Sequence, residues 1–178
     1  VRDVEREPVR RVDARIPETV RASLRHYQER GYSWLYKNVR VGFNSLIADD
    51  MGLGKTLQVI AAIAKLKEEG LTREAPGIIV VPTTLLTNWQ REVKKFAPSL
   101  QLSIYHGAGR RFKKKGYDAL LTTYGTVRRE SALFIKTKWS FVVVDEAQNI
   151  KNAETAQTKA IKSLSATVRI AMTGTPVE

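Results

Sequence analysis

Short, continuously apolar runs that alternate with helical stretches constrain this fold more than any other feature of the sequence. Six such runs are predicted to be buried strands, namely residues 44–48, 77–81, 102–105, 119–123, 141–145 and 169–173. They are apolar throughout instead of alternating apolar with polar residues, which is typical of strands that are covered on both faces. Strands of this kind form parallel sheets, so we expect an α/β fold.

Helical stretches separate these runs. Three of them have apolar positions at helical spacing and end at a stop signal or a polar segment, namely residues 55–70, 84–98 and 153–164. Residues 24–39 are also predicted to be helical, with Gly31 at a close contact or a break. Repeated strand–helix units predict a doubly wound, mainly parallel sheet flanked by helices, whose ligands bind at the carboxyl ends of the strands.

The chain has 178 residues, which is enough for one substantial core with at most an appendage. Residues 1–20 mix Arg with Asp and Glu, include Pro8 and Pro17, and lack a sustained apolar period. This composition indicates a charged linker or arm outside the core. We therefore expect a single lobe over residues 21–178.

The charge of the chain indicates the class of partner. Thirty Lys and Arg residues against eighteen Asp and Glu give a net charge of +12, which attracts polyanions such as nucleic acid. A basic surface that only keeps the protein soluble is an equally good interpretation of the charge alone.

The sequence contains no cysteine, which excludes disulfides, thiol catalysis and Cys-ligated zinc. No apolar run approaches the roughly 20 residues of a membrane span, so we expect an intracellular protein without a membrane partner.

The stretch IADDMGLGKT runs from the end of the first predicted strand into a predicted helix that begins at Lys55, which is the context of a phosphate-binding loop. Gly52 and Gly54 allow backbone N–H groups to turn toward phosphate oxygens. Lys55 can reach the β and γ phosphates, and the Thr56 hydroxyl can bind magnesium. Asp49 occupies the position of the first glycine of the usual pattern. The alternative is a glycine-rich turn without chemistry.

A second motif, FVVVDEAQ, places two carboxylates at the end of a buried strand. Asp145 can hold a hydrated magnesium ion, and Glu146 can orient the attacking water. An acidic helix cap is the alternative interpretation of such a pair on its own. Phosphoryl transfer needs a phosphate cradle, a metal-holding acid and a water-positioning group together, so the two motifs support each other.

The motifs GLGKT, DEAQ and MTGTP, in this order, resemble those of the first RecA-like lobe of helicase superfamily two. The segments LRHYQERGYSWL, DDMGLGKT, VVPTTLLTNWQREVKKF and LLTTYGTVRRE narrow the resemblance to the Swi/Snf family of DNA-translocating, chromatin-remodelling-type ATPases. The likeness covers about residues 22–177. An acidic residue at the position of Asp49 is usual in that family, which accounts for the missing glycine.

The resemblance implies a RecA-like lobe that uses ATP and Mg²⁺, binds double-stranded DNA and works with a second RecA-like lobe further along the chain. It implies nucleotide contacts by Gln28, which would read adenine, and by Asp50, Met51, Gly52, Leu53, Gly54, Lys55 and Thr56. Thr56 and Asp145 would hold the metal, and Lys55, Asp145 and Glu146 would act in catalysis. Residues that couple hydrolysis to DNA contact would be Gln148, Thr173, Gly174 and Thr175.

The resemblance also implies that loops after the strands contact DNA, and their hydroxyls and helix starts suit sequence-independent phosphate binding. Their candidate residues are Thr83, Thr84, Thr123, Tyr124, Arg128 and Arg129. The segment GRRFKKKG is either a solvated surface turn or a second DNA contact, with Arg110, Arg111, Lys113, Lys114 and Lys115 as its cations. Trp89 and Trp139 are predicted to lie in the core, since each has apolar neighbours.

These observations predict the ATP-binding lobe of a DNA-dependent ATPase that remodels protein–DNA complexes. DNA-bound proteins are then further partners, in a microbial cytoplasm or nucleoid or in a nucleus. Without its second lobe, the chain is expected to hydrolyse ATP poorly. The alternatives are a basic nucleic-acid-binding module with a vestigial nucleotide loop, and a lobe of an RNA helicase.

Overall fold

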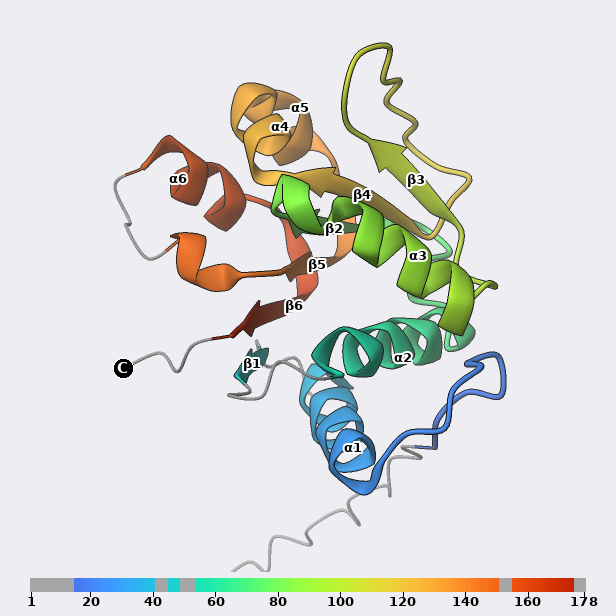
Figure 1. The fold of residues 1–178 in the computed structure, drawn as a ribbon. Helices are drawn as coiled ribbons and strands as arrows, with labels where there is room; N and C mark the ends of the chain where they lie inside the picture. Colours follow the sequence, from blue (N-terminus) through green and yellow to red (C-terminus); the bar gives the residue numbers. More distant parts are fainter. Residues whose placement is uncertain (1–14, 41–44, 49–53, 151–154, 175–178) are drawn as a thin grey trace, which may run out of the picture.

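The computed structural model describes residues 15–40, 45–48, 54–150 and 155–174 (Figure 1). Within these residues, six parallel strands form one sheet in the order β1-β6-β5-β2-β4-β3. The strands are β1 (Ser45–Ala48), β2 (Gly77–Val81), β3 (Leu102–Tyr105), β4 (Ala119–Thr123), β5 (Trp139–Val144) and β6 (Ala166–Thr173). The predicted α/β class with a parallel sheet is confirmed.

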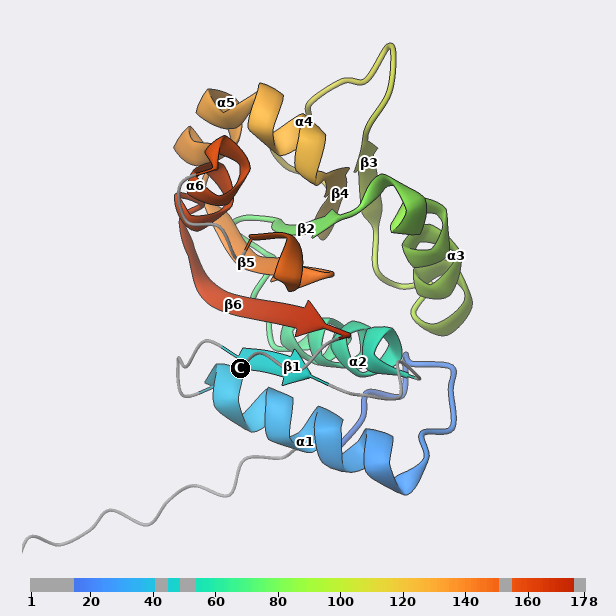
Figure 2. The same cartoon turned by 60° about the vertical axis from the view of Figure 1, so that its left-hand side comes forward.

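Helices cover both faces of the sheet, as Figure 2 shows from the side. One face carries α1 (His26–Arg40), α2 (Lys55–Glu68) and α3 (Leu86–Phe96), and the other carries α4 (Tyr124–Arg129), α5 (Ser131–Lys136) and α6 (Ala156–Lys162). Two short 3-10 helices, η1 (Thr83–Leu85) and η2 (Ala147–Ile150), follow β2 and β5. This double covering explains the continuously apolar strands, because neighbouring residues of one strand enter opposite cores.

Strand β2 illustrates the arrangement. Ile79 and Val81 pack into the core beneath α1 to α3, whereas Ile78 and Val80 pack into the core beneath α4 to α6. All four side chains are at most 1% exposed. Burial of each such side chain stabilises the fold by about 1.5–3 kcal/mol before the entropy cost is counted. The two cores together fix the sheet between two layers of helices.

Helix α1 runs through Gly31 without a break, so the predicted close contact is confirmed and the predicted break is not. A Cβ atom at Gly31 would lie 2.2 Å from the side-chain oxygen of Gln58 on α2. Tyr32, Leu35 and Tyr36 fill the same interface and are almost fully buried. Glycine therefore allows α1 to approach α2 closely at this point.

The end of the predicted arm lies against the lobe. Val20 is buried in the core, and Ile16 packs beside it. The Tyr32 hydroxyl donates a hydrogen bond to the Arg15 carbonyl, 3.0 Å away. The described part of residues 1–20 thus contributes apolar side chains to the core of the lobe. Residues 1–14 lie outside the described residues.

Helices α4 and α5 occur where the sequence analysis expected a loop after β4. Thr123 caps α4, since its hydroxyl accepts a hydrogen bond from the Thr126 N–H at 3.3 Å. Phe134 anchors α5 through complete burial. Each helix has only six residues, so tertiary packing rather than helix propensity stabilises it. No helix of the described residues is long and apolar enough to cross a membrane.

Candidate nucleotide and metal site

The carboxyl ends of three neighbouring strands bring the predicted nucleotide residues together. Strand β6 lies between β1 and β5, with Thr173 opposite Ala48 and Ala171 opposite Val144. Asp145 directly follows Val144, and α2 begins at Lys55 beyond the end of β1. Lys55 at the start of α2, the DE pair after β5 and Thr173 of MTGTP therefore meet at one edge of the sheet.

The structure describes the last three residues of the predicted phosphate-binding motif, Gly54, Lys55 and Thr56. Gly54 has a φ of 86°, a left-handed conformation that favours glycine, and it is followed by the first residue of α2. Lys55 is buried, and its Nζ donates a hydrogen bond to the Thr173 carbonyl at 2.8 Å. Thr56 is half-buried beside it. The predicted contacts Asp50, Met51, Gly52, Leu53 and Thr175, and also Asp49, lie outside the described residues.

Gln28 reaches the phosphate loop from α1. Its side chain is only 8% exposed, and a Cβ atom at Gly54 would lie 1.9 Å from its Nε2 atom. Its Oε1 atom accepts a hydrogen bond from the Arg25 N–H at 2.9 Å, which leaves the amide NH₂ facing the loop. Gln28 is therefore buried beside Gly54. Its contact with adenine stays a prediction.

Asp145 is a buried carboxylate with two donors from the protein. Trp89 Nε1 donates to Oδ2 at 2.7 Å, and the Glu146 N–H donates to Oδ1 at 2.8 Å. Burial raises the pKa of the Asp145 carboxyl, and the negative charge of Glu146 raises it further. The two hydrogen bonds and the positive charge of Lys55 act in the opposite direction. The net increase shows that these partners compensate the buried charge incompletely.

Glu146 occupies an unusual backbone conformation. Its φ is 53°, the single positive value of a non-glycine residue in the described part of the chain. A non-glycine residue in this region is uncommon and is found at functional sites more often than elsewhere. The turn orients the Glu146 carboxylate toward Gln148, whose Nε2 donates a hydrogen bond to Glu146 Oε2. The backbone thus directs the predicted water-positioning group.

A chain of hydrogen bonds connects this carboxylate to β6. The Thr173 hydroxyl donates to Gln148 Oε1 at 2.9 Å, and the Gln148 amide then donates to Glu146. Thr173 also accepts the Lys55 hydrogen bond through its carbonyl. A Cβ atom at Gly174 would lie 3.9 Å from Lys55 Nζ. Of the predicted coupling residues, Gln148 and Thr173 therefore contact catalytic candidates directly, and Gly174 lies near Lys55.

Two of the predicted DNA contacts, Thr123 and Tyr124, are buried. The Tyr124 hydroxyl donates to the carbonyls of Asp145 and, at 3.4 Å, of Glu146. Burial raises the pKa of the Tyr124 hydroxyl, so it remains a donor. The Thr123 hydroxyl lies 2.9 Å from the Thr126 hydroxyl inside α4. These side chains are therefore engaged inside the lobe, where Tyr124 contacts the DE turn and Thr123 caps helix α4. Their contact with DNA stays a prediction.

The remaining DNA candidates at this edge are exposed. Thr83 and Thr84 lie in η1 after β2, and Arg128 and Arg129 lie in the last turn of α4 after β4. Strands β2 and β4 are paired along their length. Hydroxyls and guanidinium groups thus emerge from neighbouring strand ends, beside the catalytic candidates.

The basic segment GRRFKKKG divides into two parts. Arg110 is paired with Glu130 at 3.0 Å and lies over the Tyr105 ring, so its charge is already engaged. Phe112, which the sequence analysis did not select, packs edge-on against Tyr105, Phe134 and Trp139. This aromatic contact anchors the segment on the sheet. Arg111 and the three lysines at positions 113–115 are exposed.

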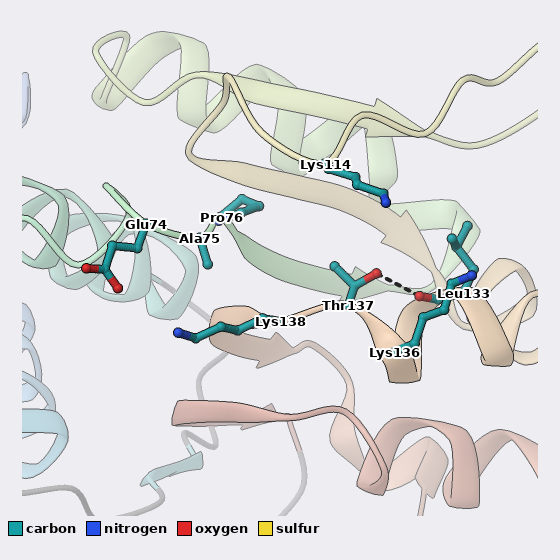
Figure 3. Close-up of a pocket in the computed structure, with 8 residues that line it drawn as sticks. All are labelled: Glu74, Ala75, Pro76, Lys114, Leu133, Lys136, Thr137 and Lys138. Atoms are coloured by element: carbon teal, nitrogen blue, oxygen red, sulfur yellow. Dashed lines mark hydrogen bonds between the residues drawn. The ribbon is translucent and has the colours of Figure 1, made fainter.

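Lys114 lies at the opposite end of the sheet from the catalytic candidates. It lines a pocket of about 400 Å³ at the start of β5 together with Lys136 and Lys138 (Figure 3). The Thr137 hydroxyl in this pocket donates to the Leu133 carbonyl at 2.7 Å. Lys114 therefore does not extend the surface formed by Thr83, Thr84 and the arginines of α4.

The donor set at the carboxyl edge fits magnesium and a nucleotide phosphate. Asp145 keeps lone pairs beyond its two hydrogen bonds, and its raised pKa indicates that a further cation would stabilise its charge. Among the described residues, no cluster of three or more His, Cys, Asp or Glu side chains could hold a metal alone. Mg²⁺ is commonly held by one or two carboxylates, water and substrate phosphates, so this sparse set suits it.

Trp89 and Trp139 lie in the core, as predicted, at 0% and 1% exposure. The sequence analysis did not foresee that the Trp89 N–H would reach Asp145, although a buried indole N–H usually needs an acceptor. The hydroxyl of Tyr124 was missed in the same way. Such contacts join residues far apart in the chain, and the local patterns around them resemble ordinary core segments.

Comparison with known proteins identifies relatives of the whole lobe. The SNF2-related domain matches residues 27–178. YwqA of Bacillus subtilis is 40% identical over 171 residues, which cover 92% of this chain and 18% of that protein. Helicase SWR1 of Saccharomyces cerevisiae is 36% identical over 183 residues, covering 98% of this chain and 12% of that protein. The chain thus spans less than a fifth of the length of these curated relatives.

Solved structures give the same result. The Sulfolobus solfataricus SWI2/SNF2 ATPase core in complex with dsDNA has a TM-score of 0.86 and 41% identity, covering 93% of this chain and 35% of that chain. The ATPase core domain of the same protein has a TM-score of 0.82 and 40% identity, covering 96% of this chain and 35% of that one. The SNF2-related domain matches most of the chain, and the fold and motifs agree with it. The chain therefore belongs to the SNF2-related family.

Proposed function

We propose that this chain is the first RecA-like, ATP-binding lobe of a double-stranded-DNA-dependent ATPase that translocates on DNA and remodels protein–DNA complexes. The observation that carries the proposal is the continuous set of contacts at one sheet edge, from Lys55 through Thr173 and Gln148 to Glu146. These contacts join a phosphate-binding motif to a water-positioning carboxylate. ATP turnover coupled to conformational change needs such a connection.

Each residue has a distinct role in the proposed reaction. Lys55 binds the β and γ phosphates, and its three donors allow it to retain the Thr173 carbonyl while it does so. Thr56 and Asp145 hold magnesium, which neutralises charge on the phosphates when it is bound. Glu146 orients the attacking water, and Gln148 fixes the direction of its carboxylate. Gln28 contacts adenine through the amide that faces Gly54.

The exposed groups beside this site are the proposed DNA contacts. Thr83, Thr84, Arg128 and Arg129 follow neighbouring strands and offer hydroxyls and positive charge, which bind phosphates without reading sequence. The net charge of +12 favours the same partner. The Sulfolobus relative was solved with double-stranded DNA. A separate, second candidate contact consists of Arg111, Lys113, Lys114 and Lys115. Arg110 is not included, because it is paired with Glu130.

A second RecA-like lobe completes the proposed motor. The chain covers 35% of the Sulfolobus ATPase core, which leaves room for such a lobe. An arginine supplied to the γ phosphate from another element increases turnover in nucleotide hydrolases by about 10³–10⁵-fold. We therefore expect this lobe alone to bind ATP weakly and hydrolyse it poorly. Proteins bound to DNA are the proposed targets, in a nucleoid or a nucleus.

The decisive experiment measures ATP turnover of the natural protein that contains this chain, with no nucleic acid, with duplex DNA and with RNA. Stimulation by duplex DNA is the expected result. Stimulation by RNA alone would assign the lobe to an RNA helicase. Absence of turnover under all three conditions would instead support a basic binding module with a vestigial nucleotide loop.

A further inference from the structure

The indole of Trp89 makes a contact that burial alone does not explain. The ring is fully buried on α3, and Nε1 donates to Asp145 Oδ2 at 2.7 Å. The N–H group is the one polar atom of an indole, and a buried indole needs an acceptor for it. Here the acceptor is the carboxylate at the end of β5, which lies 56 positions later in the chain.

Trp139 shows how the same requirement is met elsewhere in the lobe. Its ring is 1% exposed, and Nε1 donates to the Phe134 carbonyl at 2.9 Å. A backbone carbonyl therefore satisfies a buried indole in this fold without involving a charged group. The carboxylate partner of Trp89 is a special feature of the carboxyl edge of the sheet.

The hydrogen bond of Trp89 constrains the carboxylate in a way that no local contact does. The Glu146 N–H binds Oδ1 from the same turn, and Trp89 binds Oδ2 from a different helix. Two donors on the two oxygens fix the rotation of the carboxyl plane. Tyr124 holds the carbonyl of Asp145 and leaves the carboxylate oxygens to these two donors. The orientation of the carboxylate therefore depends on the position of α3.

Helix α3 also begins at the proposed DNA surface. The exposed Thr83 and Thr84 lie in η1, which leads directly into α3, and Trp89 lies in the first turns of that helix. Val93 and Trp89 are the side chains that bury α3 in the core. A displacement of the start of α3 is therefore transmitted along a short rigid segment to the indole N–H.

We propose that Trp89 is a positioning residue that connects DNA contact at the start of α3 to the orientation of the Asp145 carboxylate. The proposal rests on the proposed function, because it takes Asp145 as the group that holds magnesium. DNA bound at η1 sets the position of α3, and the indole then holds the carboxylate in the direction that magnesium requires. Trp89 acts through Asp145 and does not touch the reacting atoms.

The test compares Trp89→Phe with Trp139→Phe in the natural protein that contains this chain. Both variants remove one buried indole hydrogen bond and leave a ring of similar shape. Binding of a fluorescent ATP analogue is measured with and without Mg²⁺, and ATP turnover is measured with and without duplex DNA. Melting temperatures establish that each variant is folded.

Trp89→Phe is expected to reduce the Mg²⁺-dependent gain in nucleotide affinity by about 10–100-fold, the usual effect of removing a partner that orients a metal ligand. Affinity without Mg²⁺ should stay unchanged, and the ratio of DNA-stimulated to basal turnover should fall. Trp139→Phe should retain both the Mg²⁺ gain and the DNA stimulation. Trp89→His, which keeps a ring N–H, should recover part of the gain and replaces Trp89→Phe if that variant does not fold.

Two results would overturn the inference. One is an unchanged Mg²⁺ gain and DNA stimulation in a folded Trp89 variant, and the other is an equal loss in Trp139→Phe, which would indicate a general packing effect. A wild-type protein without DNA-stimulated turnover would instead contradict the proposed function. The nucleotide-binding comparison still tests the Trp89–Asp145 connection in that case, so the two failures are distinguishable.

Discussion

Two buried aspartates at opposite ends of the same sheet have different environments. Asp118 precedes β4, and its oxygens accept hydrogen bonds from Lys67 Nζ and the Gln101 N–H, both at 2.8 Å, and from the Thr72 hydroxyl at 2.9 Å. Asp145 follows β5 and has only an indole and a backbone N–H as direct donors in the described structure. One carboxylate has an ammonium partner, and the other retains capacity for a cation.

The difference separates a structural carboxylate from a functional one. A buried charge is tolerated when an opposite charge and hydrogen bonds compensate it, as Lys67 does for Asp118. At Asp145 the compensation is incomplete, and burial raises its pKa. Destabilised carboxylates of this kind gather at functional sites because a ligand or metal supplies the missing charge. The environment of Asp118 thus fits a role in stability, and the environment of Asp145 fits the proposed role in binding a cation.

The largest effect is expected from Glu146→Gln at the carboxyl end. The substitution keeps the size of the side chain and removes the charge that orients water, so ATP turnover should fall by about 10²–10⁴-fold. Nucleotide affinity should change little. Steady-state turnover and binding of a fluorescent nucleotide measure the two quantities. Lys138→Ala, at the opposite end, is the control and should leave turnover unchanged; normal turnover in Glu146→Gln would remove this residue from its role.

The second prediction is that substitution of Asp118 lowers stability, whereas substitution of Asp145 lowers activity. Asp118→Asn loses the ion pair with Lys67 and weakens its hydrogen bonds, so the free energy of unfolding should fall by about 2 kcal/mol. Turnover per folded molecule should be unchanged. Asp145→Asn should lower turnover, though less than Glu146→Gln does, while the free energy of unfolding stays constant or rises, because an incompletely compensated charge is lost. Denaturant unfolding measures the free energy of unfolding of both variants, and a steady-state assay measures their ATP turnover. The same response in both proteins would contradict the distinction.

The third prediction concerns the hydrogen-bond chain from β6 to the DE turn. Gln148→Ala and Thr173→Val each interrupt it, and each should lower DNA-stimulated turnover by roughly tenfold, the equivalent of about one hydrogen bond. Since both residues belong to one network, the double variant should be little worse than either single variant. A double-mutant cycle of turnover measures the coupling energy. Additive losses would show that the two residues act independently.

Much of the fold could be predicted from the sequence, because the strands of a parallel sheet need an unusually apolar composition. Strands buried on both faces must be apolar throughout, so their positions in the chain are visible without the structure. The predicted strand at 77–81 agrees with β2, and the predicted close contact at Gly31 is found against Gln58. The proximity of Lys55 to the DE pair at one sheet edge was also predictable, since each motif follows a predicted strand of a parallel sheet.

The contacts between these motifs could not be predicted, because their partners are distant in the chain. Arg110 finds Glu130 twenty positions later, and Tyr124 reaches the carbonyl of Asp145. Both were assigned to DNA binding from local composition, which does not show which charges and hydroxyls have partners inside the fold. Helices α4 and α5 were missed for a related reason. Their short sequences form helices only because Thr123 caps one and Phe134 anchors the other in the core.

The smallest expected effect is an alkaline loss of stability at the amino-terminal end. Burial raises the pKa of Tyr117, next to Asp118, to about 12 from an ordinary value of 10. The folded state therefore retains the Tyr117 proton between these values, where the unfolded state loses it. The contribution of this proton to the free energy of unfolding is fully present below pH 10 and declines as the pH rises through 12. Denaturant unfolding at pH 9 and pH 11.5 measures it.

Tyr117→Phe provides the comparison for that measurement. The variant loses the hydrogen bond from Tyr117 to the Lys113 carbonyl at every pH, but it has no hydroxyl to ionise. Its free energy of unfolding should therefore fall less steeply than that of the wild type between pH 10 and 12. The Tyr124 hydroxyl, whose pKa burial also raises, remains in both proteins and cancels from the difference. Parallel pH dependences would show that the Tyr117 hydroxyl is not buried enough to matter. A steeper wild-type curve would show that the Tyr117 hydroxyl, at the amino-terminal end of the sheet, stabilises the fold as long as it keeps its proton. The carboxylates at the carboxyl end are instead proposed to bind ligands.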